Sequence, residues 1–328
     1  MRKLSPDFMT DLKEGGLLSP ILKAVQTDKD LIMEIRKNYI NIYYKGGSIL
    51  KLGCMRNKNE YRPTFDEKYA KSNPKHTKEV KKRLKVNKIT TMKEAEKWAD
   101  NIRFFKSIMD YNSSTSEKTK LEKSSQQMIV QENNLTKKNN RSKELGSSDY
   151  FIIDFEYQCR AFQYQGKRVI PRFDLVGLFW DIKNHNKPEG CRLAMIEVKY
   201  GDESLQGEHG LTDHLIKAEK FLDNKKREED FKKEMVTIFQ QKCELGILNI
   251  ENPHEVTIDA ICEKIDFLFI IAGHDPGENS VLGNELNNMK PKIKKTNVLF
   301  ATSSFAGYAL FKENIKSFTE FMDLLNKK

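Results

Sequence analysis

The sequence lacks the features of several protein classes. Its five cysteines in 328 residues are scattered and odd in number, and none forms a C-x-x-C pair. A disulfide framework or a zinc site is therefore not expected, and reduced thiols are typical of a cytosolic protein. No apolar run approaches the length of a membrane span, and the first residues lack the apolar core of a signal peptide. We therefore expect a soluble, cytoplasmic protein without a membrane partner.

Short motifs of several enzyme classes are also missing. The chain has no HExxH or HxxxH pattern, no G-x-S-x-G, no P-loop and no G-x-G-x-x-G. Gly201, Gly207 and Gly210 are not preceded by the strand of a dinucleotide-binding unit, and they indicate turns. Serine hydrolases and nucleotide-driven enzymes are therefore poor candidates.

Positive charge is abundant and unevenly distributed. Residues 1–150 hold 32 of the 57 Lys and Arg and 19 of the 47 Asp and Glu, an excess of +13, whereas the rest of the chain carries −3. Such a surplus favours contact with phosphate, but a lysine-rich surface gives the same pattern. The densest basic run lies in residues 66–90, where the candidates for nucleic-acid contact are Lys78, Lys82, Arg83 and Lys85. A plain exposed surface explains this run equally well.

The pattern of apolar residues predicts two regions. Residues 1–110 form an N-terminal α/β extension with a helical stretch from Ser19 to Ile35 and a hairpin of Tyr39–Tyr44 and Ser48–Leu52 around a Gly-Gly turn. A helix capped by Thr90 or Thr91 runs to about residue 109.

Residues 111–328 form the second region, for which we expect a mixed central sheet flanked by helices. The predicted order from residue 116 is α-β-β-β-α-β with C-terminal additions. The expected elements are helix 116–133; strands Tyr150–Gln158, Arg172–Leu178 and Leu193–Tyr200; helix Gly210–Leu222, extending to Cys243 with a break near Asn224; strands Asp266–Ala272, Val298–Thr302 and Tyr308–Phe311; and helix Ile315–Leu325.

Charged residues interrupt two of these apolar strands. Asp174 lies in one, and Glu197-Val198-Lys199 lies in the next. In a strand, residues i and i+2 share a face, so Glu197 and Lys199 project together, and the neighbouring strand can bring Asp174 beside them. Buried carboxylates are costly unless they are paired or bind a cation, and carboxylate oxygens suit Mg²⁺ or Mn²⁺. An edge strand with one polar face and a Glu–Lys pair is the alternative.

The run Pro171-Arg172-Phe173-Asp174 followed by Glu197-Val198-Lys199 resembles the signature of the PD-(D/E)xK nuclease superfamily, although two residues separate its proline from its aspartate. The resemblance implies a restriction-endonuclease-like αβββαβ core and a metal-dependent endonuclease acting on DNA. It also implies that Asp174, Glu197 and the Val198 carbonyl bind Mg²⁺ or Mn²⁺. Lys199 would hold or deprotonate the attacking water, which makes Asp174, Glu197 and Lys199 the catalytic residues.

Further residues are secondary candidates on the same resemblance. Asp154 and Glu156 on the preceding strand could bind the same or a second metal, and His209 could contact phosphate. Either Glu122 or Glu132 could be the acid contributed by the preceding helix. For each of them an ordinary surface role is the alternative.

The layout also resembles uncharacterised bacterial proteins whose nuclease relatives occur in anti-phage loci. This likeness implies a homo-oligomer or a subunit of an antiviral defence complex. RNA as the substrate, or a catalytically silent nucleic-acid-binding or assembly subunit, remains open.

Overall fold

The chain forms two compact units, which are described separately. The computed structural model describes residues 1–55, 60–114, 121–134, 148–181, 190–248, 250, 253–262, 264–273, 280–303 and 315–326. One unit comprises Met1–Gln127 and Thr237–Asn249, and the other comprises Met128–Val236 and Ile250–Lys328. Each combines helices with a sheet, so the fold is of the α/β class. Within these residues no helix is long and apolar enough to cross a membrane.

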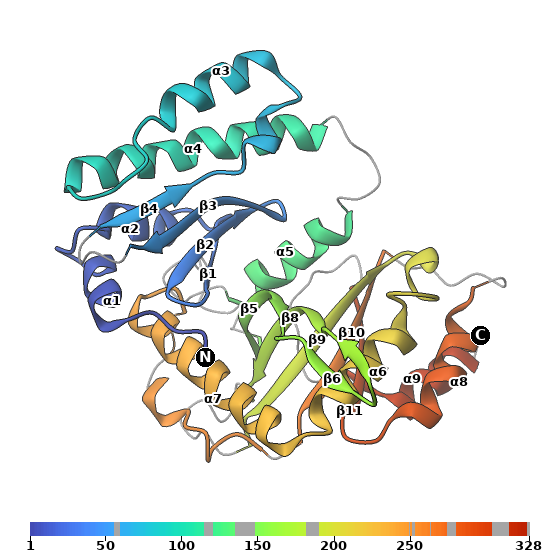
Figure 1. Ribbon diagram of the computed structural model, residues 1–328. Helices are drawn as coiled ribbons and strands as arrows, with labels where there is room; N and C mark the ends of the chain where they lie inside the picture. The colour runs from blue at the N-terminus through green and yellow to red at the C-terminus, as the bar shows by residue number, and fades with distance from the viewer. Residues whose placement is uncertain are drawn as a thin grey trace. The chain divides into compact units, whose positions relative to one another are not determined.

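The first unit is built on a four-stranded antiparallel sheet in the order β1-β2-β3-β4. Helix α4 packs on this sheet, and α3 lies beside α4 (Figure 1). Arg83 at the end of α3 donates a hydrogen bond to Asn101 of α4. The elements are α1 (Pro6–Leu12), α2 (Ser19–Thr27), β1 (Ile32–Ile35), β2 (Tyr39–Tyr44), β3 (Gly47–Cys54), β4 (Tyr61–Thr64), η1 (Glu67–Ala70), α3 (Pro74–Arg83) and α4 (Met92–Ser114).

Two sequence predictions for this unit are confirmed and one is wrong. β2 and β3 form the expected hairpin, with Lys45 and Gly46 at positive φ in its turn. α4 begins with a capping box, because Glu94 accepts from the amides that precede it and Thr91 Oγ1 accepts from the Glu94 amide. The helix predicted to extend to Ile35 ends at Thr27, however, and Ile32–Ile35 is strand β1. Pairing with β2 decides the structure of this apolar segment.

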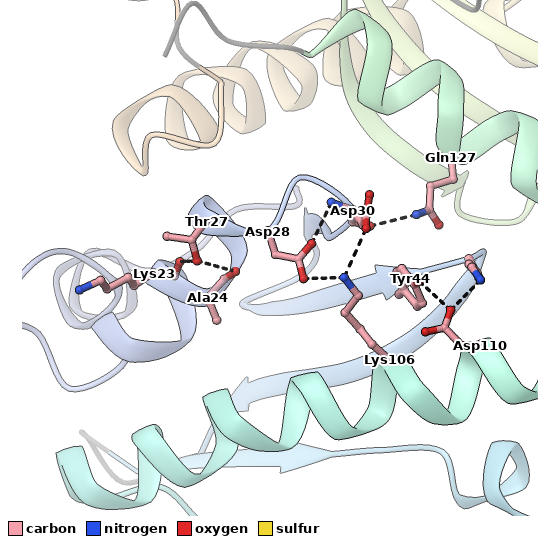
Figure 2. A network of polar contacts seen from close by, with 10 residues as sticks. Lys23, Ala24, Thr27, Asp28, Asp30, Tyr44, Lys106, Asp110 and Gln127 are labelled. Atoms are coloured by element: carbon pink, nitrogen blue, oxygen red, sulfur yellow. Dashed lines mark hydrogen bonds and ion pairs between the residues drawn. The ribbon is translucent and has the colours of Figure 1, made fainter. Parts of the chain in front are cut away.

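A polar network ties α4 to the sheet of the first unit (Figure 2). Lys106 lies 2.6 Å from an Asp28 carboxylate oxygen and 3.4 Å from one of Asp30, both in the segment before β1. Tyr44 donates its hydroxyl to Asp110 of α4 at 2.7 Å. Burial, followed by the bond to Asp110, raises the pKa of Tyr44 well above its usual range, so the phenol stays protonated. Together these contacts link α4 to β2 and to the segment before β1.

The second unit is built on a six-stranded mixed sheet in the order β12-β11-β10-β9-β8-β5. β5, β8 and β9 are antiparallel neighbours, β9, β10 and β11 run parallel, and β12 is antiparallel to β11. The strands are β5 (Tyr150–Gln158), β8 (Arg172–Phe179), β9 (Arg192–Tyr200), β10 (Asp266–Ala272), β11 (Asn297–Ser303) and β12 (Lys316–Ser317), and a small separate hairpin consists of β6 (Phe162–Tyr164) and β7 (Lys167–Val169).

Helices accompany this sheet, and two of them are shared between the units. α5 (Leu121–Asn133) begins in the first unit and ends in the second, whereas α7 (Lys225–Glu244) does the reverse. α6 (Leu211–Leu222) contacts β10 and α8 (Leu282–Met289), and α9 (Phe318–Asn326) contacts β11 and α8. The remaining short turns are η3 (Asp202–Ser204), η4 (Pro253–Glu255) and η5 (Lys290–Lys292). The strand predicted at Tyr308–Phe311 lies outside the described residues.

The centre of the second sheet is apolar on both faces, as expected for a covered parallel strand. Every residue of β10 is buried, and so are seven of the nine residues of β9, from Leu193 to Lys199. Glu219 of α6 joins the helical layer to this sheet. Its carboxylate accepts hydrogen bonds from the amides of Lys294, Lys295 and Thr296 just before β11.

Candidate functional site

Asp174 and Glu197 occupy equivalent positions at the end of a strand pairing. The β8–β9 ladder runs from Phe179 opposite Arg192 to Leu175 opposite Ile196. Asp174 is the next residue of β8 and Glu197 is the next residue of β9, so both stand directly beyond the last paired residues. The two carboxylates predicted to cooperate therefore lie on adjacent strands at the same end of their ladder.

The Asp174 carboxylate contacts the backbone of the second motif. Its Oδ2 accepts a hydrogen bond from the Val198 amide at 2.8 Å. In a β-strand the N–H and C=O of one residue point to the same neighbouring strand. The Val198 carbonyl therefore points toward β8, to the side where Asp174 lies. This arrangement gathers a carboxylate and a carbonyl oxygen where the two strands cease to pair.

Glu197, Lys199 and His214 form a buried charged cluster. Lys199 Nζ lies 2.7 Å from Glu197 Oε1, and His214 Nε2 of α6 lies 3.0 Å from the same oxygen. The side chains are only 3%, 6% and 10% exposed for Glu197, Lys199 and His214. The alternation along β9 puts Glu197 and Lys199 on one face, and the contact with His214 shows that α6 covers that face.

The cluster is energetically unfavourable as a purely structural feature. Removing charges from water costs several kcal/mol for each ion, and a close partner only partly offsets this cost. Burial, followed by the positive charges of Lys199 and Lys217, lowers the pKa of His214 to about 3. The imidazole is therefore neutral near pH 7. A titratable group perturbed by burial beside charged partners is a candidate for a functional site.

The preceding strand carries the secondary acidic candidates. A bulge between Ile152 and Asp154 shifts the β5–β8 register, and Asp154 is fully buried opposite Val176. Glu156 follows two positions later, across from the Asp174 position in that register. It has φ 55°, a region that non-glycine residues rarely adopt and that occurs in turns and at active sites.

The remaining candidates, Glu122 and His209, lie on α5 and just before α6. Glu122 lies in the first turn of α5, in the part of that helix that belongs to the first unit. His209 is exposed just before α6, has φ 74° and donates its amide to Asp213. Its ring centroid lies 6.1 Å from that of His214. No sequence motif identified His214 as part of the site. Its position on the apolar face of α6, with Leu211 and Leu215, does predict that it is buried.

The candidate nucleic-acid contacts lie on and just after α3 in the first unit. Lys78, Lys82 and Lys85 are exposed, and Lys75 is exposed on the same helix face as Lys78 and Lys82. Arg83 is half-buried: its guanidinium bonds to Glu79 and Asn101 and covers the Phe104 ring. Arg83 therefore has a packing role, and the exposed lysines form what we call the α3 lysine face (Lys75, Lys78 and Lys82).

The donor set at the end of the ladder fits a hard divalent cation. Two carboxylates and a backbone carbonyl are the oxygen ligands that Mg²⁺ and Mn²⁺ prefer, with water completing the shell. Across the residues that can be described, no group of three or more His, Cys, Asp or Glu side chains gathers closely enough to hold a metal. A cation would therefore depend on the Val198 carbonyl and water in addition to Asp174 and Glu197.

Comparison with known proteins gives no independent assignment. No protein-family model, curated protein or solved structure matches the chain.

Proposed function

We propose that the chain is a Mg²⁺- or Mn²⁺-dependent nuclease that hydrolyses phosphodiester bonds in DNA. The observation that carries this proposal is the arrangement at the end of the β8–β9 ladder. The Asp174 carboxylate accepts a hydrogen bond from the amide of Val198. The residues on either side of Val198, Glu197 and Lys199, form a buried ion pair. Such a charged group in an apolar sheet has little value for stability, and its composition matches the needs of phosphodiester hydrolysis.

The order of elements supports the same proposal. α5, β5, β8, β9, α6 and β10 follow one another along the chain, with the β6–β7 hairpin inserted after β5. This is the αβββαβ order of the PD-(D/E)xK core, which the sequence motif resembles. The acid falls on the second of these strands and the Glu-x-Lys run on the third, as the resemblance requires.

We assign Asp174, one Glu197 oxygen and the Val198 carbonyl to the cation. A bound Mg²⁺ or Mn²⁺ supplies Lewis-acid polarisation of the phosphate and lowers the pKa of a bound water. Asp174 is already oriented by the Val198 amide, so it needs little rearrangement to bind a cation. Asp154 and Glu156 stand on the neighbouring strand, where they can add negative charge for the same or a second cation.

Lys199 has a separate role in the proposal. Its ammonium is held within 2.7 Å of Glu197, so it is positioned beside the carboxylate that binds the cation. Once that carboxylate binds a cation, the ammonium can donate to the attacking water or to a phosphate oxygen. It would then stabilise the negative charge that develops on the phosphate in the transition state.

The α3 lysine face is the proposed phosphate-binding surface. Three exposed lysines recur at intervals of three and four residues, so their ammonium groups lie along one side of the helix. In the described part of the chain, none of the three takes part in an ion pair. Such a face suits the repeating charges of a nucleic-acid backbone and carries no sequence information. Both DNA and RNA satisfy this chemistry.

The test is cleavage of matched DNA and RNA substrates by the full-length protein. Plasmid, linear duplex, single-stranded DNA and an RNA of the same sequence are incubated with Mg²⁺, Mn²⁺ or a chelator. Cutting should require the cation and should be lost in Asp174→Asn, Glu197→Gln and Lys199→Met variants. Lys295→Met is the matched control, because Lys295 is exposed and forms a 3.6 Å pair with Asp223, which has no part in the proposed site.

The alternative function is a nucleic-acid-binding subunit with a silent site. The mutual pairing of Glu197, Lys199 and His214 favours it, since these groups partly satisfy one another without a cation. That function predicts salt-sensitive retention of DNA with no effect of metal. Cleavage that persists in a chelator and in both the Asp174→Asn and Lys199→Met variants contradicts the proposed mechanism.

A further inference from the structure

A histidine from α6 holds the proposed metal-binding carboxylate in place. His214 Nε2 and Lys199 Nζ approach the same oxygen, Glu197 Oε1, at 3.0 Å and 2.7 Å. One donor comes from the same strand as the carboxylate, and the other comes from the helix that covers it. Two donors from different elements restrict rotation of a carboxylate far more than either donor alone.

The direction of the histidine bond follows from the chemistry of its partner. An ionised carboxylate only accepts hydrogen bonds, so the proton between the two groups resides on His214 Nε2. Asp213 fixes the start of α6 by accepting from the His209 amide at 3.0 Å and from Lys217 at 2.6 Å. The ring of His214 is 90% buried, so it has little room to turn away from Glu197.

We propose that His214 is a positioning residue that orients Glu197 for the divalent cation. This inference rests on the proposed nuclease function and assigns the two donors different roles. Lys199 leaves Glu197 to act on the phosphate or the water, while His214 keeps Oε1 bound and presents Oε2 to the cation. The hydrogen bond of a second residue to a metal-binding side chain typically changes metal affinity by about 10- to 100-fold.

The first experiment measures Mn²⁺ binding to the full-length protein without nucleic acid, by electron paramagnetic resonance and calorimetry. His214→Phe keeps the ring and removes the donor, and we expect its dissociation constant to rise about 10- to 100-fold. His214→Gln keeps an N–H donor and should restore most of the affinity. His254→Phe is the matched control, because His254 is exposed on η4 of the same unit. A His214→Phe dissociation constant equal to that of the parent overturns the inference.

A second measurement needs no variant and so does not depend on folding of the altered chain. Proton–nitrogen NMR of histidine rings reports which ring nitrogen carries the proton. We expect His214 to be the Nε2–H tautomer in the metal-free protein, and the Nδ1–H tautomer would overturn the inference. Failure of the proposed function looks different, because the unaltered protein would then neither bind Mn²⁺ nor cut nucleic acid.

Discussion

Replacing the buried ion pair on β9 by apolar side chains should separate its cost to stability from its use in catalysis. Lys199→Met alone removes the ammonium from the cluster of Glu197, Lys199 and His214. The Glu197 carboxylate, which is 3% exposed, then keeps His214 as its donor from this cluster. Breaking one side of a buried pair typically costs about 3–5 kcal/mol, because the other charge stays buried. We expect a loss of this order in the free energy of unfolding of the second unit.

The double variant with Glu197→Leu should regain most of this loss. Both charges are then gone, and the new side chains are apolar and of similar size. One cost that remains is the His214 N–H, which loses its acceptor and contributes about 1–3 kcal/mol. Adding His214→Phe removes that donor as well. The triple variant should therefore match the parent or exceed it by about 1–4 kcal/mol, as replaced buried pairs have done elsewhere.

The assay must report on the second unit alone, because a chain of two units need not unfold in one step. Each unit contains one of the two tryptophans, Trp98 in the first and Trp180 in the second, and both are buried. Urea unfolding of fluorotryptophan-labelled protein, followed by fluorine NMR, therefore resolves the two units. Lys295→Met serves as the control, because Lys295 forms an exposed pair with Asp223, and it should change stability by about 0–1 kcal/mol. A triple variant less stable than Lys199→Met alone would refute the reasoning, because the pair would then be a main source of stability.

Three further predictions concern other features of the chain. Glu219→Ala should cost about 1–3 kcal/mol and accelerate hydrogen exchange in β11 but not in β5, because the amide of the buried Thr296 loses its acceptor; unchanged exchange in β11 would contradict this role. Burial raises the pKa of the Cys191 and Cys243 thiols to about 12, so iodoacetamide at pH 8 should modify both far more slowly in the folded protein than after unfolding, as read by mass spectrometry. Changing Lys75, Lys78 and Lys82 to Gln should lower the slope of log affinity against log salt by about 2–3 for duplex DNA, whereas the same change at the exposed Lys225 and Lys226 should leave it unaltered.

Local patterns in the sequence were sufficient for many elements of the fold. The alternation and β-branched content of Tyr39–Tyr44 and the apolar run of Asp266–Ala272 predicted strands that the structure contains with the same bounds. The helix break near Asn224 was also predicted, and α6 ends at Leu222 before α7 begins at Lys225. These features depend on residues close together in the chain, for which periodicity and turn residues are direct evidence.

Features that depend on distant residues were not predictable in the same way. Ile32–Ile35 has an apolar pattern compatible with a helix, and only its pairing with β2 makes it a strand. Similarly, the sequence identified Glu197 and Lys199 from their place in an apolar strand, but the contact of His214 depends on how α6 packs. The bulge in β5, which sets the register of Glu156, also has no local signal comparable to a glycine turn.

Both units are discontinuous in sequence, and this limits where the chain can be divided into fragments that fold. Residues 237–249 belong to the first unit although they follow much of the second, and among them Ile238, Phe239, Leu245 and Leu248 are buried. A fragment that starts at Met128 would lack most of the first unit. The apolar side chains of residues 237–249 would then lose their packing partners and be exposed to water. Expression of the second unit by itself therefore calls for trimming or redesigning the end of α7. A single protease cut between the two units should not release two independent fragments.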